Sequence, residues 1–285
     1  MADTQSQPLL MRVPRALLST VMIVVIIGWS LPWIGLAITA FRPVTDATGS
    51  GWWNVFGSPA LTLDNFAATL SSQGLWRSVL NSVAITVPTV LLVLIVASAA
   101  AFALVWTDLP YRKAIYAFLV GLLVVPPEIT LVPTLQILKQ LGLVNTYPGV
   151  WLSHVSAILP FAVFLLANFF AQVPRELVEA AKVDGASTLK IFLKLILPLS
   201  WSALASLAIF DFLWVWNDLL RALIIIPDPN LLPLTATLSN LGGGYGENIT
   251  VMAAGAVLLM VPPLLIFLFA QRAFVRGVMA GAVKS

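Results

Sequence analysis

The chain has 285 residues, of which 60% are hydrophobic and only 9% are charged, with a net charge of +3. Soluble domains are roughly half apolar and about a quarter charged, so this composition excludes an ordinary soluble protein and predicts an all-α membrane protein. The absence of cysteine and the single histidine, His154, exclude disulfides, thiolate ligands and a multi-histidine metal centre.

The positions of the charged residues predict six membrane-spanning helices, because a span requires about 20 predominantly apolar residues. The first is the run 16–41, which is too long for the hydrophobic region of a signal peptide and has no convincing cleavage site. Three more lie in the uncharged gaps 78–107, 140–174 and 248–271. The third and fifth spans, 114–138 and 195–223, contain acidic residues.

Six spans place both termini on one side of the membrane, and the excess of basic residues makes that side the cytoplasm. The net charge then follows from the topology and needs no nucleic-acid partner. Four of the fifteen basic residues lie elsewhere, namely Arg42, Arg77, Lys139 and Arg221. The other eleven are Arg12, Arg15, Arg112, Lys113, Arg175, Lys182, Lys190, Lys194, Arg272, Arg276 and Lys284.

Two external segments, 42–66 and 224–248, are rich in Gly, Ser, Pro and Asn and are predicted to be irregular. The first carries Trp52 and Trp53, which we expect at the level of the lipid headgroups. In the third span Pro126 and Pro127 predict a break or bend. Glu128 beside them indicates a water-filled or protein-lined region rather than lipid.

A charged segment follows the fourth span, since six of the eighteen residues in 175–192 are ionisable. Pro174 is well placed at a helix start, Gly185 at a left-handed helix end and Ser187 at the cap of a second helix. The second helix carries Lys190 and Lys194 on one side. We therefore predict a helix–glycine–helix elbow at the membrane surface; an amphipathic linker that only covers headgroups is the alternative.

Within this segment, "EAAKVDGASTLKIFLKLILP" resembles the EAA loop of ABC importer permeases: Glu-Ala-Ala, three residues, Gly, nine residues, then Ile-x-Leu-Pro. Leu195 replaces the isoleucine of that pattern. The stretches "GLVNTYPG", "WND" (216–218) and "GVMAGAVK" resemble the carbohydrate branch of that family, of the second-permease kind, from about residue 65 onward. The residues implied to couple to an ATPase are Glu179, Ala180, Ala181, Asp184, Gly185 and Pro198.

The resemblance implies one permease domain over 1–285, with a coupling loop at 174–198, in the cytoplasmic membrane of a bacterium. The implied partners are a second homologous permease, two ATP-binding cassette subunits and an extracytoplasmic solute-binding protein. The chain has no Walker-type glycine loop and is not expected to be an enzyme or to bind a cofactor, because ATP and Mg²⁺ would be bound by the partner ATPase.

Polar residues inside membrane spans are costly and are therefore candidates for function. The candidate lining of a substrate path consists of Glu128, Asp211, Trp214, Asn217 and Asp218. Asp211 and Asp218 are seven residues apart and would share one face of a helix.

Packing alternatives exist for several of these residues. For Asp218 and Arg221, which is three residues later, we favour a structural ion pair that serves packing. Packing is also favoured for His154 and for Trp214 and Trp216, although the two indoles are suited to stacking on a sugar. Asp211 has no partner within its own helix, and for Glu128 the functional and structural interpretations carry equal weight.

The leading hypothesis is a permease subunit of an ATP-driven importer of a sugar or sugar derivative. The alternatives are an importer of another solute, such as glycerol phosphate or a polyamine, and an ion-coupled secondary transporter that uses Glu128, Asp211 and Asp218. A membrane enzyme has the least support, because no metal cluster or catalytic set is found in the sequence.

Overall fold

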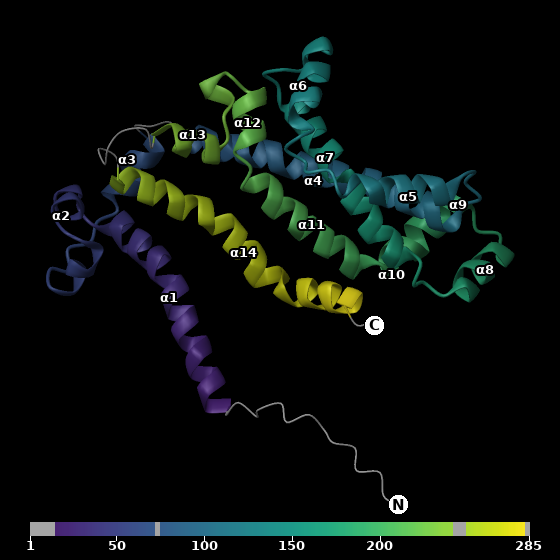
Figure 1. Ribbon diagram of the computed structural model, residues 1–285, viewed down its shortest axis with the longest axis horizontal. Coiled ribbons are helices and arrows are strands. Elements are labelled where there is room, and N and C mark those ends of the chain that lie inside the picture. Colours follow the sequence, from purple (N-terminus) through teal and green to yellow (C-terminus); the bar gives the residue numbers. More distant parts are fainter. Residues whose placement is uncertain (1–14, 72–74, 242–248, 283–285) are drawn as a thin grey trace, which may run out of the picture.

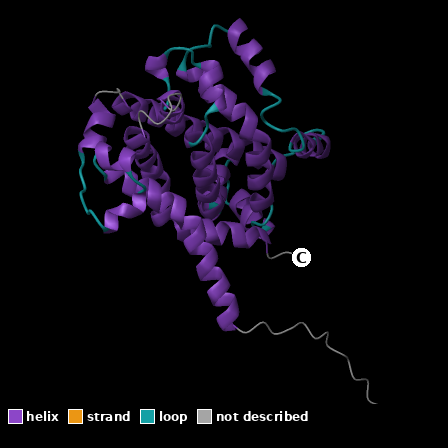
Figure 2. Ribbon diagram, turned by 60° about the vertical axis from the view of Figure 1, so that its left-hand side comes forward, coloured by secondary structure: helices purple, strands orange, loops and turns teal. Residues whose placement is uncertain are grey.

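The computed structural model describes residues 15–71, 75–241 and 249–282, and every regular element in these ranges is a helix (Figures 1 and 2). Arg12, Lys284 and the stretch 242–248, on which predictions were made above, lie outside the described residues. The four longest helices are α1 (Arg15–Phe41), α4 (Leu75–Trp106), α7 (Tyr147–Phe170) and α14 (Ile249–Ala282).

These four helices match the first, second, fourth and sixth predicted spans. Each contains at least 21 residues that are apolar enough to cross a membrane, and in α14 this part is Ile249–Phe269. Figure 1 shows the start of α1 extending away from the other helices, while its end meets α14. The prediction of several long membrane helices is therefore confirmed.

The third predicted span is not one helix. The structure forms α5 (Arg112–Leu122) and α6 (Leu131–Gln140), with turns between them. Pro126 and Pro127 lie in this gap, where a missing N–H and a fixed φ interrupt the helical hydrogen bonds. The break predicted from the prolines is confirmed, and it divides the apolar stretch into two short helices.

The fifth predicted span is divided as well. Helix α9 (Thr188–Ile191) precedes the predicted span and continues through a π-helical turn η2 (Phe192–Ile196) into α10 (Leu197–Leu199), and the chain then bends by 75° into α11 (Trp201–Trp216). The span was predicted to rise from Pro198, but the straight helix begins three residues later. At 1.5 Å per residue, α11 is about 24 Å long, less than the ~30 Å of a bilayer core.

Short helices cover the ends of α1, α4 and α14 where the first external segment was predicted. They are α2 (Val44–Gly49), η1 (Trp52–Phe56) and α3 (Asp64–Ser71). The buried Arg42 guanidinium organises them by donating to the carbonyl oxygens of Asp46 (2.9 Å) and Gly51 (2.8 Å). The segment predicted to be irregular is therefore ordered around one arginine.

The second external segment contains α12 (Leu220–Ile225), η3 (Pro229–Leu231) and α13 (Leu234–Leu241). Asn81 of α4 holds it in place, because its side-chain amide donates to the carbonyl oxygens of Asn230 and Leu232, both at 2.9 Å. The amide oxygen of Asn81 accepts from the hydroxyl of Tyr147 at 2.7 Å. One buried asparagine thus joins α4, α7 and the segment before α13.

The stretch "GLVNTYPG" forms the turn between α6 and α7. Gly142 and Asn145 have φ angles of +67° and +63°, a region that favours Gly and Asn. The Thr146 hydroxyl caps α7 by accepting from the backbone N–H of Gly149 at 3.2 Å. The local chemistry of the stretch accounts for its conformation, and no substrate is required to explain it.

The largest core lies where α4 packs on α7. Small side chains in this core, among them Ala97, Ala101 and Ala162, let the two helices approach closely. The same core extends to Val178 and Ile191 in the charged segment, which is thereby fixed to the membrane helices.

Candidate functional site

The charged segment folds into helix α8 (Arg175–Val183), a glycine turn and a second short helix. Pro174 directly precedes α8, and Gly185 after it has a φ of +75°. The Ser187 hydroxyl accepts from the backbone N–H of Lys190 at 3.3 Å and caps the second helix. The helix start, the left-handed glycine and the serine cap are present as predicted.

Helix α8 is attached by one face only. Val178 is 2% exposed and lies in the α4–α7 core, and the half-buried Ala181 packs against the same core. Glu179 and Ala180 are exposed, as is Asp184 at the C-terminal cap. The predicted coupling residues are thus divided between an anchored face and a face open to contact.

A polar hollow of about 340 Å³ adjoins α8. Its walls come from the end of α4, the segment after it, the start of α5, the residue after α7 and α8 itself. The indole N–H of Trp106, one of the lining residues, donates to the carbonyl oxygen of Phe170 at 3.2 Å. The charged side chains that line it are Asp108, Arg112, Arg175, Glu179 and Lys182. Throughout the described ranges, none of these five forms an ion pair.

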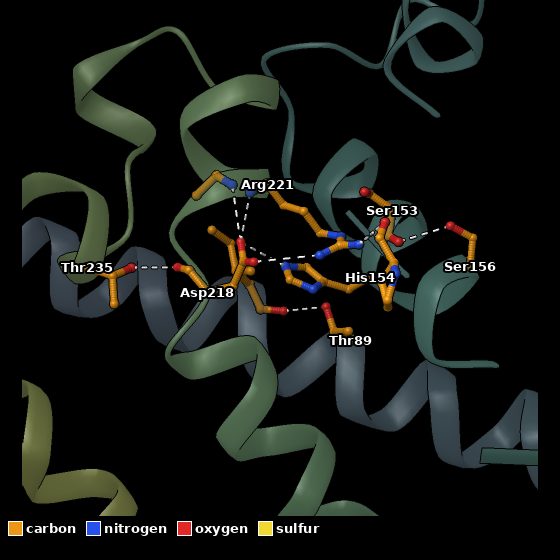
Figure 3. Close-up of polar contacts among 10 residues, drawn as sticks. Thr89, Ser153, His154, Ser156, Asp218, Arg221 and Thr235 are labelled. Carbon is orange, nitrogen blue, oxygen red and sulfur yellow. Dashed lines mark hydrogen bonds and ion pairs between the residues drawn. The ribbon is translucent and has the colours of Figure 1, made fainter. Parts of the chain in front are cut away.

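A second polar group lies between α7, α11 and α12 (Figure 3). The Asp218 carboxylate lies 3.7 Å from Nη1 of Arg221 and 3.8 Å from Nε2 of His154. Arg221 also donates to the carbonyl oxygen of Pro127, at 3.1 Å. We call Asp218, Arg221 and His154 the buried polar cluster; it ties both broken spans to α7.

The position of Asp218 corrects one prediction. Its carboxylate accepts from the backbone N–H groups of Arg221 (3.0 Å) and Ala222 (3.4 Å), so it caps α12. Helix α11 has already ended at Trp216. The expectation that Asp211 and Asp218 share a face of one continuous helix was therefore wrong, because the capping aspartate starts a new helix instead of extending the old one.

Only the Asp218–Arg221 pair was foreseeable from sequence, since the two residues are three apart. His154 is 4% exposed and lies 64 positions before Asp218, and the Pro127 carbonyl group carries no side-chain signal at all. The space around the cluster is about 10 Å³, room for about one water molecule and far too small for a sugar. The geometry thus favours packing for the pair, and a place for Asp218 on a substrate path stays a prediction.

Asp211 is separate from this cluster. It is 1% exposed in α11, and neither of its carboxylate oxygens has a hydrogen-bond partner in the part of the chain that the structure describes. Leaving a buried carboxylate unsatisfied is unfavourable, and such a group is uncommon in a site that only serves packing. Asp211 therefore remains a candidate for the substrate path.

The other candidates have different surroundings. Trp216 is buried, and its indole N–H donates to the carbonyl oxygen of Leu259 in α14 at 2.9 Å, in agreement with packing. Trp214 is half-buried and meets Phe210 edge-on at 6.0 Å. Asn217 is exposed, and so is Glu128 between α5 and α6. The structure does not bring these side chains together with Asp211 into one pocket.

Comparisons with known proteins agree with this architecture. A family model described as "binding-protein-dependent transport system inner membrane component" matches residues 65–280. The osmoprotective compounds uptake permease protein GgtD of Synechocystis sp. is 46% identical over 262 residues, which cover 90% of this chain and 88% of GgtD. The alpha-glucoside transport system permease protein AglG of Rhizobium meliloti is 47% identical over 232 residues, 79% of this chain and 61% of AglG.

A solved structure supports the fold independently. It is a bacterial ABC transporter involved in the import of the acidic polysaccharide alginate, of which one chain matches with a TM-score of 0.80 at 20% identity. The match covers 91% of this chain and 95% of that one. With a family model that spans most of its length, the chain belongs to the binding-protein-dependent transport system inner membrane components.

Proposed function

We propose that this chain is a permease subunit of an ATP-driven importer in the bacterial cytoplasmic membrane, and that its substrate is a sugar or sugar derivative. The family membership supports the transport role. The relative AglG, described as an alpha-glucoside transport system permease protein, supports a sugar, and GgtD, described as an uptake permease for osmoprotective compounds, supports uptake of a solute. Substrate would be delivered by an extracytoplasmic solute-binding protein.

The distribution of positive charge supports a neutral sugar over an anion such as glycerol phosphate. Two of the four basic residues outside the predicted cytoplasmic side are buried, because Arg42 binds backbone carbonyl groups and Arg221 pairs with Asp218. Arg77 donates to the side chain of Asn230 at 3.0 Å. Arg42, Arg77 and Arg221 are thus each held by separate contacts within the chain, and these three do not form a cationic cluster to attract phosphate.

We further propose six crossings with both termini in the cytoplasm. The four continuous helices would supply four of them, α5 with α6 the third, and α11 with its flanking turns the fifth. Because the chain lacks cysteine, this topology can be tested with single cysteines and a membrane-impermeant thiol reagent. A cysteine at Asn54 should react from outside and one at Lys190 only after the membrane is opened; the reverse pattern would refute the orientation.

The observation that carries the mechanism is α8, which is fixed to the core by Val178 and presents Glu179 to contact. We propose that α8 is the coupling helix and docks on one of two ATPase subunits, which bind ATP and Mg²⁺. Closure of the ATPases would move α8, and through it the α4–α7 core and the equivalent core of a second permease. That movement would switch the complex between inward-open and outward-open states as rigid parts.

A charge reversal tests the docking role. We expect Glu179→Lys to abolish ATP-driven uptake of radiolabelled sugar, because it places a cation in the proposed ATPase contact, while the protein remains in the membrane. Glu176→Lys is the matched control, since it makes the same change one turn earlier, outside the charged wall of the hollow. Normal uptake by Glu179→Lys would exclude the docking role.

The subunit composition tests the proposal as a whole. The tagged chain, extracted from its native membranes in mild detergent, should be recovered with an ATPase that carries Walker motifs and with a second multi-span permease, both identified by mass spectrometry. Recovery of this chain alone, under conditions that preserve known membrane complexes, would favour a self-sufficient carrier driven by an ion gradient.

A further inference from the structure

The polar hollow beside α8 continues into a second hollow of opposite character. This second space has a volume of about 310 Å³ and runs between α4, α5 and α7, with a mostly apolar lining. The two spaces share Val105, Arg112 and Ala171 in their walls. We call the first the polar hollow and the second the apolar groove.

The charges of the pair favour an anion. Arg112, Arg175 and Lys182 line the polar hollow, and Lys113 joins Arg112 at the groove, against the carboxylates of Asp108 and Glu179. Arg112, Arg175 and Lys182 are exposed and without an ion-pair partner among the residues described. Arginine donors in a fork match the oxygens of a phosphate group, and nearby lysines add attraction.

The groove leads from this cationic site toward the membrane interior. Its lining reaches Ala167, about one helical turn deeper along α7 than the shared Ala171, and also includes Leu104 of α4 and Tyr116 of α5. The Tyr116 hydroxyl accepts from the side chain of Asn168 at 3.2 Å, which holds α5 against α7 along the groove.

We propose that the polar hollow and the apolar groove together bind one anionic phospholipid. The phosphate would lie between Arg112 and Arg175, and an acyl chain would lie in the groove along α5. The order of the two spaces matches the order of a lipid at the inner leaflet, with the charged end at the helix termini and the apolar end deeper. A free anion would use only the hollow and leave the groove without a function.

The position of this site gives it a consequence for transport. Glu179 and Arg175 belong both to the wall of the hollow and to α8, so a bound headgroup would neutralise the cations beside the proposed coupling helix. The inference depends on the orientation proposed above, in which α8 faces the cytoplasm. Lipid binding can nevertheless be measured without transport, so the two proposals can fail separately.

The test uses the intact complex in nanodiscs that contain equal amounts of phosphatidylglycerol and phosphatidylcholine with the same acyl chains. Lipid that stays bound after release into detergent is counted by native mass spectrometry. We expect phosphatidylglycerol to be retained preferentially. Arg112→Gln with Arg175→Gln should lower its affinity on the order of thirtyfold, since each basic residue near the surface contributes about fivefold.

Two further variants separate position and shape from charge. Lys190→Gln with Lys194→Gln removes two cations from the neighbouring helical segment without touching either space, and it should retain the lipid. Ala171→Trp fills the junction of the two spaces with the charges intact, and it should lose the lipid. Size-exclusion elution of each complex reports whether it is still assembled and folded.

Any of the following results would overturn the proposal. One is equal retention of the two lipids by the unaltered complex. Another is an equal loss of phosphatidylglycerol from the Arg112/Arg175 and the Lys190/Lys194 variants, or none from Ala171→Trp. The third is complete displacement of the lipid by inorganic phosphate at moderate excess, which would assign the hollow to a free anion. A cysteine placed at Asp108 can be treated with a thiol reagent in a delipidated complex. If that cysteine is protected from the reagent, the hollow is covered by a partner protein, and the lipid site is refuted.

Discussion

Asp218 is expected to stabilise the fold mainly by neutralising the buried cation of Arg221. The Arg221 side chain is 3% exposed, and its Nη1 lies 3.7 Å from the Asp218 carboxylate. Removing one partner of a buried ion pair typically costs about 3–5 kcal/mol, because the other charge stays buried without compensation. The spacing is long and Arg221 keeps its bond to the Pro127 carbonyl group, so we expect about 3 kcal/mol for Asp218→Asn.

A second substitution separates the helix cap from the charge. Asparagine caps a helix about as well as aspartate, whereas alanine removes the cap at a cost of about 1 kcal/mol, so Asp218→Ala should lose about 4 kcal/mol in total. Adding Arg221→Met to Asp218→Asn removes both charges and should recover most of the loss. Asp228→Asn is the control, because Asp228 caps η3 without a buried cation, and it should change stability by less than about 0.5 kcal/mol.

The assay is reversible unfolding of the purified chain in mixed detergent and SDS micelles, followed by tryptophan fluorescence, with the free energy compared between variants. Helix α12 should also exchange its amide hydrogens faster in Asp218→Ala, because that substitution removes the acceptor for two of its N–H groups. If Asp218→Asn is as stable as the unaltered chain to within about 0.5 kcal/mol, charge compensation is not what Asp218 provides, and the reasoning from burial is refuted.

Two other substitutions test the structure elsewhere. Gly149→Ala should destabilise the chain by about 1–3 kcal/mol in the same unfolding assay, because the added methyl group would overlap the Leu143 carbonyl oxygen. Gly121→Ala is the control and should be neutral, because there is open space around Gly121. Equal effects of the two substitutions would contradict the tight α6–α7 turn. Asp211→Asn should lower sugar uptake while leaving the complex assembled, as measured by transport and size-exclusion elution; loss of assembly would instead assign Asp211 to packing.

Local chemistry determined much of this protein from sequence alone. The long apolar runs of α1, α4, α7 and α14 can be recognised in the sequence, because a bilayer-spanning helix must form its backbone hydrogen bonds internally and present apolar side chains to the lipid. The elbow was equally predictable from the sequence, since Gly185 and Ser187 act on their immediate neighbours in the chain. The break at Pro126 and Pro127 is local for the same reason.

Features that depend on distant contacts could not be read in this way. Asp218 looked like part of a continuous apolar span, and its carboxylate lies beside His154 only because α7 packs against the segment that joins α11 and α12. The ordering of the first external segment by Arg42 likewise depends on carbonyl groups, which every residue carries and no sequence pattern distinguishes.

The sequence by itself therefore determined the membrane helices, the glycine elbow and the resemblance to a transporter family, all of which depend on the identity of adjacent residues. Only the tertiary structure decided that the fifth span is bent and ends early, that Asp211 is buried without a partner among the described residues and that a cationic hollow adjoins an apolar groove beside α8. The physical reason is that burial, pairing and cavity shape are properties of surfaces brought together by packing, and residues far apart in the chain supply those surfaces.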